Sequence, residues 1–219
     1  MKRYYGPAAG WLRYLLTGLK DIAGPENEWR QANLLEQQQI KAARPVAFGL
    51  ERTCCLMRRA LVITLKMDGE RLEDAFAAGM TLEHKIRVME QLAAFAGRFH
   101  AQGFSHQDFY LCHLFWNEAT SEIGLIDLQR IRRQKGLEAA LPLRWLVKDL
   151  AQLDYSCRRT LSQEEYSVLK EVFVSGYAKY LPIVKERRTR EMIHKKVQRI
   201  ARHDSKLRAR RKQPQHFGR

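Results

Sequence analysis

The sequence has no long apolar run and no secretory leader pattern. No stretch approaches the roughly 18 uninterrupted apolar residues that suggest a membrane-spanning helix. The most apolar segment, Cys54 to Met67, is interrupted by Arg58, Arg59 and Lys66. The N-terminus also lacks the apolar core of a signal peptide. We therefore expect a cytoplasmic protein.

Cysteine is scarce, and its placement argues against disulfides and zinc. Cys54 and Cys55 are adjacent, whereas Cys112 and Cys157 stand alone, so the sequence has no C-x-x-C pair and no zinc spacing. Reduced, buried thiols are the simpler interpretation, and they agree with a cytoplasmic location.

Positive charge is in excess and lies mainly in the C-terminal tail. The formal net charge is +15, and residues 185–219 contribute 14 Lys and Arg against 3 Asp and Glu. The rest of the chain is nearly balanced, and its apolar content suffices for a packed core. Such a tail favours an anionic surface, either lipid headgroups and the phosphates of a lipid-linked saccharide or nucleic acid. Nucleic acid is the less expected partner because no aromatic residues interleave with the tail's basic residues and no recognition motif occurs.

Hydrophobic periodicity predicts a strand, a helix, further strands and then a mostly helical half. Strands are expected at the N-terminus and over 46–51, 54–67 and 123–128. Helices are expected from Pro25 to about Ala42, from Thr81 to Gly103, over 143–156, from Ser162 to about Tyr180, and in the tail to about Ala201. Ser162 and Glu165 have the spacing of a capping box.

The most informative segment is His106-Gln107-Asp108, followed by His113 and by Asp127 at the end of an apolar run. The second Asp comes nineteen residues after the first, which is the spacing of a kinase catalytic loop and its metal-binding Asp. In that interpretation Asp108 orients the attacking hydroxyl and Asp127 holds the Mg²⁺ that bridges the ATP phosphates. His113 stands where most kinases have Asn as a second Mg²⁺ ligand.

Four further residues have two open interpretations each. Lys2 and Glu28 are in the right order for the Lys–Glu pair that holds the α/β-phosphates of ATP, but they could be an ordinary N-terminal Lys and a dipole-favoured Glu. Asp149 could hydrogen-bond the catalytic-loop backbone or be a solvated helix charge. Arg130 could contact an anionic substrate or belong to a solvated face.

Taken together, these segments resemble the lipopolysaccharide core heptose kinase family of the Kdo/WaaP type. The resemblance is carried by residues 1–4, 26–29, 46–49, 106–113, 126–130, 144–145 and 148–150. It implies an α+β, protein-kinase-like two-lobe fold with an incomplete N-terminal lobe and a mostly helical C-terminal lobe. We expect a partial N-lobe over 1–72, the C-lobe with the catalytic loop over 73–184, and a basic tail over 185–219.

The same resemblance implies ATP- and Mg²⁺-dependent phosphorylation of a sugar hydroxyl of lipopolysaccharide, on an inner-core heptose. The protein would work as a peripheral enzyme at the cytoplasmic face of the inner membrane. Asp108 would be the catalytic Asp, Asp127 and His113 the metal ligands, Lys2 the ATP lysine and Glu28 its partner.

Two departures keep other functions open. The chain begins at the expected ATP lysine, without the two strands and glycine-rich loop that precede it in a kinase, so either the true start lies upstream or the enzyme is truncated or decayed. Gln107 replaces the common Arg before Asp108, which argues against control by an activation-loop phosphate. A non-catalytic kinase-like binding protein is therefore an alternative, as is a phosphotransferase for a protein or a small soluble substrate.

Overall fold

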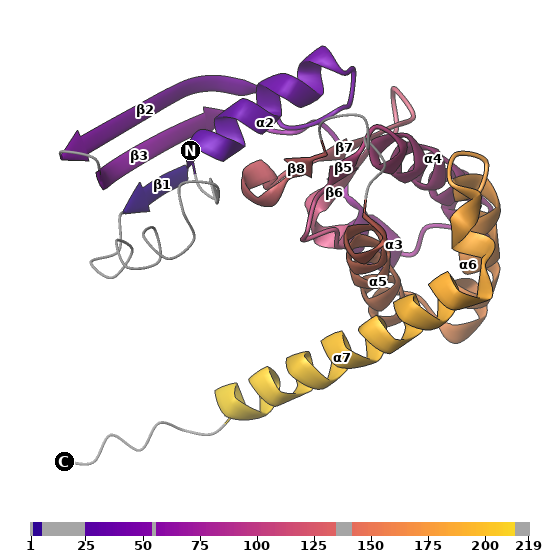
Figure 1. Cartoon of the computed structure of the whole chain (residues 1–219). Coiled ribbons are helices and arrows are strands. Elements are labelled where there is room, and N and C mark those ends of the chain that lie inside the picture. The colour runs from indigo at the N-terminus through magenta and orange to yellow at the C-terminus, as the bar shows by residue number, and fades with distance from the viewer. Residues whose placement is uncertain (1, 6–24, 54–55, 135–141, 213–219) are drawn as a thin grey trace.

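The computed structural model describes residues 2–5, 25–53, 56–134 and 142–212 (Figure 1). The strands are β1 (Lys2–Tyr5), β2 (Pro45–Thr53), β3 (Leu56–Thr64), β4 (Glu70–Arg71), β5 (Phe104–Ser105), β6 (Leu114–Asn117), β7 (Glu122–Leu125) and β8 (Arg132–Arg133). The helices are α2 (Pro25–Gln37), α3 (Leu72–Ala77), α4 (Leu82–Ala101), α5 (Leu143–Thr160), α6 (Gln163–Tyr177) and α7 (Arg187–Lys212), with short 3₁₀ turns η1 (Leu111–His113), η2 (Leu128–Arg130) and η3 (Pro182–Lys185).

The N-terminal part is an antiparallel sheet in the order β1-β3-β2, with α2 lying along it (Figure 1). Alternate residues of β3, Ala60 and Val62, are buried, as a sheet with one covered face requires. The expectation that α2 reaches Ala42 was wrong. Gln39 adopts a left-handed φ of 56°, and the Ile40 N–H donates to the Leu35 carbonyl at 2.9 Å, which closes the helix.

The helical part is built on α4, whose apolar residues from Val88 to Phe99 are mostly buried. Helix α6 packs so closely against it that a Cβ at Gly176 would lie 2.9 Å from that of Ala93. The buried ammonium of Lys85 in α4 binds Glu165 of α6 at 2.7 Å. Glu165 also forms the predicted capping box with Ser162, which is confirmed.

The segment that follows α2 is hydrogen-bonded to strand β7 of the β6–β7 hairpin, which links the N-terminal sheet to the helical part. The Leu125 N–H donates to the Lys41 carbonyl at 3.1 Å, and the Ala43 N–H donates to the Leu125 carbonyl at 2.8 Å. Strand β7 therefore ends at Leu125, earlier than the sequence predicts, and Asp127 lies two residues beyond it.

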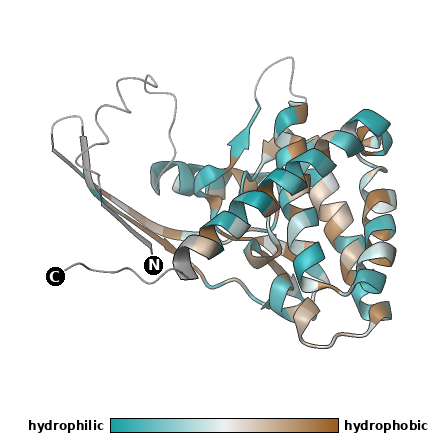
Figure 2. Cartoon of the chain, turned by 90° about the horizontal axis from the view of Figure 1, so that it is seen from below, coloured by the Kyte–Doolittle hydropathy of each residue, from teal (hydrophilic) through white to brown (hydrophobic). Residues whose placement is uncertain are grey.

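Helix α7 packs across α5 and then continues past the helical part toward the C-terminus (Figure 1). Asp204 anchors it by accepting from the Tyr155 hydroxyl at 2.5 Å and lying 3.7 Å from Arg159. The helix runs to Lys212, eleven residues further than predicted, and it is mostly hydrophilic (Figure 2). Within the described ranges, no helix is long and apolar enough to cross a membrane.

Candidate active site

The loop that carries Asp108 is held from below by a polar stripe on α5. Asp149, Gln152 and Ser156 follow one another at three- and four-residue steps, so they share one helix face. All three are buried. Such a stripe can satisfy loop N–H groups that would otherwise be buried without a partner.

Each residue of this stripe accepts hydrogen bonds from the loop backbone. Asp149 accepts from the N–H groups of His106 at 2.7 Å and Gln107 at 2.8 Å. Gln152 accepts from the Phe109 N–H and donates to the Gln107 carbonyl at 2.9 Å. Its amide nitrogen also lies 3.5 Å from the Asp108 carboxylate. Ser156 accepts from the Leu111 N–H at 3.2 Å. The backbone on both sides of Asp108 is thereby fixed to one rigid helix.

His106 ties this loop to the segment that carries Asp127. Its Nε2 lies 2.9 Å from the Ile126 carbonyl, and its Nδ1 lies 3.3 Å from the Asp108 N–H. Because a carbonyl only accepts and an amide N–H only donates, these partners fix the neutral tautomer with the proton on Nε2. Complete burial lowers the pKa of His106 and so keeps it neutral, although the charge of Asp149 acts in the other direction.

Two residues of the site have left-handed backbone conformations. Gln107 has a φ of 67°, and Asp127 has a φ of 60°. Such conformations cost roughly 1–3 kcal/mol for a residue with a side chain, although Asp tolerates them better than Gln. The hydrogen bond from the Gln107 N–H to Asp149 offsets part of that cost, so the loop geometry depends on α5.

His113 connects Asp108 with Asp127. Its Nδ1 donates to the Asp108 carbonyl at 2.7 Å, which leaves Nε2 facing the Asp127 carboxylate at 3.8 Å. Burial alone would lower the pKa of His113, but Cys112, the Asp108 carbonyl and Asp127 together raise it to about 9. The ring is therefore an imidazolium that faces the Asp127 carboxylate.

The Asp127 carboxylate has the chemistry of a Mg²⁺ ligand, whereas His113 would offer a ligand nitrogen only after losing a proton. In the described part of the chain, no three His, Cys, Asp or Glu side chains gather as a closed metal site. Mg²⁺ commonly takes one or two protein carboxylates and completes its shell with phosphate oxygens and water. The Asp127 carboxylate meets that need, and the imidazole is the less usual ligand of the two.

The Asp108 carboxylate has a cation beside it. Arg130 Nη1 lies 2.9 Å from Asp108 Oδ2, and the Arg130 side chain is 55% exposed against 22% for Asp108. Arg130 is thus paired with Asp108 while more than half of its side chain stays exposed, and its contact with an anionic substrate stays a prediction. The alternative in which Asp149 is a solvated charge is excluded, because Asp149 is fully buried beneath the loop.

Asn27 of α2 is a site residue that the sequence analysis missed. Its Nδ2 donates to the carbonyls of Gln129 at 2.8 Å and Ile131 at 3.2 Å, on either side of Arg130. Gln31 donates to the Asn27 carbonyl oxygen at 3.2 Å and so orients the amide. Asn27 therefore holds the backbone that presents Arg130, and it links α2 to the catalytic region. Its position inside an acidic first turn gave no local signal of this role.

Lys2 and Glu28 lie in the elements that the sequence predicted. Lys2 is in β1, where it is paired with Val62 of β3, and its side chain lies outside the described residues. Glu28 is buried in the first turn of α2. Their pairing as a nucleotide-binding Lys–Glu couple stays a prediction.

A family model decides what kind of protein carries this site. The model described as the lipopolysaccharide kinase (Kdo/WaaP) family matches residues 17–173. The chain belongs to this family. The match includes Asp108, His113 and Asp127, whereas Lys2 precedes it.

Two individual proteins are similar to this chain. The lipopolysaccharide core heptose(I) kinase WaaP of Escherichia coli is 29% identical over 156 residues, which make up 66% of this chain and 57% of that protein. The chain thus spans little more than half the length of this curated relative. A solved structure of WaaP in complex with acyl carrier protein matches with a TM-score of 0.64 and 22% identity, covering 81% of this chain and 76% of that one. The expected α+β, protein-kinase-like fold is thereby confirmed.

Proposed function

We propose that this family member is an ATP-dependent kinase that phosphorylates a sugar hydroxyl of the lipopolysaccharide core, with an inner-core heptose as the acceptor. The observation that carries the proposal is the position of His113. Its two ring nitrogens face the Asp108 backbone carbonyl and the Asp127 carboxylate, so this one side chain would set the proposed catalytic Asp and the proposed metal-binding Asp relative to each other. Phosphoryl transfer depends mainly on such positioning and on electrostatic stabilisation.

The proposed reaction uses few protein groups. The acceptor hydroxyl oxygen attacks the γ-phosphorus of ATP, its proton passes to the Asp108 carboxylate, and the bond from the γ-phosphorus to the bridging oxygen breaks to release ADP. A Mg²⁺ ion held by Asp127 and His113 would neutralise charge on the phosphate oxygens. Lys2 and Glu28 would hold the α/β-phosphates.

The location proposed for this reaction is the cytoplasmic face of the inner membrane. Helix α7 exposes most of its Arg and Lys residues, and its apolar side packs partly against α5. Each basic residue near an anionic lipid surface adds roughly 1 kcal/mol to binding. A peripheral enzyme held in this way would meet a lipid-linked saccharide without a membrane-spanning helix.

The test is the transfer of label from the γ-phosphate of ATP to purified lipopolysaccharide. We expect Mg²⁺-dependent labelling of a core that contains heptose and no labelling of a core that ends before it. Nucleotide binding without transfer to any acceptor would favour the non-catalytic alternative. Labelling of a soluble protein or sugar in preference to the core would favour the alternative that the chain is a phosphotransferase for a protein or a small soluble substrate.

His113 gives a sharper prediction for the metal site. His113→Ala should raise the Mg²⁺ concentration for half-maximal activity by roughly 10- to 100-fold, the range seen when groups that support a metal site are removed. His113→Asn should lose less, because an amide can both donate to the Asp108 carbonyl and offer an oxygen to the ion. The measurement is a Mg²⁺ titration of the transfer rate.

His84→Ala is the matched control. His84 also pairs with a carboxylate, that of Glu118 at 2.8 Å, but it lies on helix α4 and is not part of the proposed metal site. An unchanged Mg²⁺ requirement in His113→Ala would remove His113 from the proposed metal site.

A further inference from the structure

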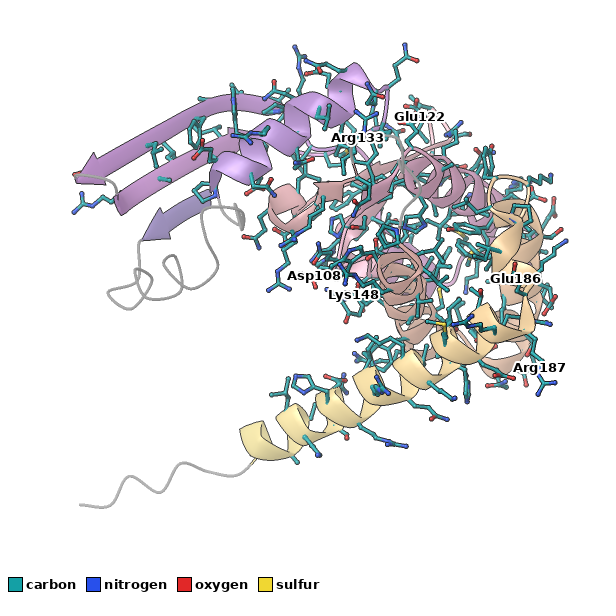
Figure 3. All side chains as sticks on the ribbon, in the orientation of Figure 1. Asp108, Glu122, Arg133, Lys148, Glu186 and Arg187 are labelled. Carbon is teal, nitrogen blue, oxygen red and sulfur yellow. The ribbon has the colours of Figure 1, made fainter. Side chains whose placement is uncertain are left out.

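Positive charge surrounds Asp108 beyond its contact with Arg130. Lys148 lies on α5, directly before Asp149, and Figure 3 shows its side chain next to Asp108. Burial lowers the pKa of Lys148, the charges of Asp108 and Asp149 act in the other direction, and those of Arg130 and Lys196 add to the lowering. Four charged groups thus lie close enough to Lys148 to influence it.

Only one of the two carboxylates in this group, that of Asp108, is available to pair with the cations. Asp149 is committed to the backbone N–H groups of the loop and is fully buried. Asp108 is therefore the carboxylate that faces Arg130 and Lys148, and Lys196 of α7 adds to the positive side. A half-buried cation that faces a like charge is unfavourable unless an anion joins it.

An aromatic residue holds Lys148 in place. The Lys148 ammonium lies 5.9 Å from the centre of the Trp145 ring, and the Arg144 guanidinium lies 4.9 Å from the same ring. Cations prefer such positions near an aromatic face. Trp145 thus restricts the flexible Lys148 stem, which reduces the entropy that binding an anion would cost.

We propose that Arg130 and Lys148 form an anion subsite for the acceptor, which binds a phosphate or carboxylate substituent of the saccharide beside Asp108. The inference rests on the proposed function, since it concerns the substrate of the same site. When the substituent binds, Arg130 exchanges the Asp108 carboxylate for the substrate anion. Asp108 is then free to take the proton of the acceptor hydroxyl. Trp145 is a positioning residue that acts through Lys148.

The nucleotide is the competing source of the anion. The residues proposed for nucleotide and metal are Lys2, Glu28, His113 and Asp127. Arg130 and Lys148 instead gather at Asp108, the residue that meets the acceptor hydroxyl. The acceptor is therefore the source that we infer, and the kinetics below distinguish it from ATP.

The test compares Arg130→Met and Lys148→Met with the wild type on two acceptors. One is the core saccharide with its anionic groups, and the other is the same saccharide after dephosphorylation and esterification of its carboxylates. Each variant should raise KM for the anionic acceptor roughly 10- to 100-fold, the effect of losing a charged hydrogen bond. KM for ATP should stay within about twofold, and the rise in KM should be much smaller on the neutral acceptor.

Conservative and matched variants separate binding from structure. Lys148→Arg and Arg130→Lys keep the charge and should restore most of the affinity for the anionic acceptor. Lys170→Met removes a lysine that also lies near an aromatic ring, 5.8 Å from Tyr166, but on α6, and it should leave both KM values unchanged.

Equal effects on both acceptors, or a rise in KM for ATP, would overturn the subsite. Unchanged kinetics in the Met variants would overturn it as well, and so would failure of the charge-conserving variants to restore affinity. Absence of transfer by the wild type would instead overturn the proposed function.

Discussion

Asp108→Asn should reduce phosphate transfer by roughly 10²- to 10⁴-fold, the usual contribution of a positioned proton acceptor. Asn has nearly the same shape and can still accept from Arg130 through its carbonyl oxygen, so the loop should keep its geometry. It cannot take the proton of the acceptor hydroxyl at neutral pH. The loss should appear in kcat, measured as label transferred from ATP at saturating acceptor.

The stability of this variant should change little. The Asp108–Arg130 pair is partly exposed, and such pairs contribute about 0–1 kcal/mol. Asp74→Asn is the matched control, because Asp74 pairs with Arg71 at 2.7 Å in the same way but on the exposed surface of α3. Asp74→Asn should keep wild-type activity. If Asp108→Asn keeps more than about a third of the wild-type kcat, far above the range for lost acid–base catalysis, Asp108 is not the proton acceptor.

The sequence was enough to single out the candidate residues that belong to one local pattern. The H-x-D loop and the Asp after the next apolar strand have a fixed spacing because a kinase places both at the ends of short elements that follow one another. For Asp149 the sequence left two alternatives open, and its complete burial shows that it binds the loop backbone and is not a solvated charge.

Contacts that depend on tertiary structure could not be predicted in the same way. Asn27 reaches carbonyls more than a hundred residues away, and nothing in the sequence around α2 specifies that approach. Gln152 and Ser156 leave a weak signal, since with Asp149 they form a polar stripe on an otherwise largely apolar helix face. The end of α2 was misplaced because a left-handed Gln39 terminates it, and Gln is not a residue that signals such a stop.

Asp149→Ala should destabilise the fold by about 3–5 kcal/mol, the cost of removing one partner from a buried charged network. Asp149 accepts from two loop N–H groups, and His100 Nε2 lies 3.4 Å from the same carboxylate. Each donor left buried without an acceptor costs about 1–3 kcal/mol. A domain has about 5–15 kcal/mol in total, so the variant should unfold at much lower urea concentration than the wild type. The measurement is urea unfolding at low temperature.

Asp154→Ala is the control for this helix. Asp154 also lies on α5 and accepts from the Tyr166 hydroxyl at 2.6 Å, but its side chain is 18% exposed, so water can replace part of what is lost. Its substitution should cost about 1.5–3 kcal/mol, the usual net value of a hydrogen bond to a charged group. Asp149→Asn, which keeps one acceptor oxygen, should fall between the two.

Hydrogen exchange tests whether the destabilisation acts through the catalytic loop. In Asp149→Asn one of the two amides, that of His106 or that of Gln107, should exchange faster than the change in global stability explains, because the asparagine keeps a single acceptor oxygen while α4 and α6 stay packed. The left-handed Gln107 would then be free to relax, and Asp108 would lose its fixed position. Faster exchange spread evenly over the helical part would mean that Asp149 supports the core as a whole and does not specifically hold the loop.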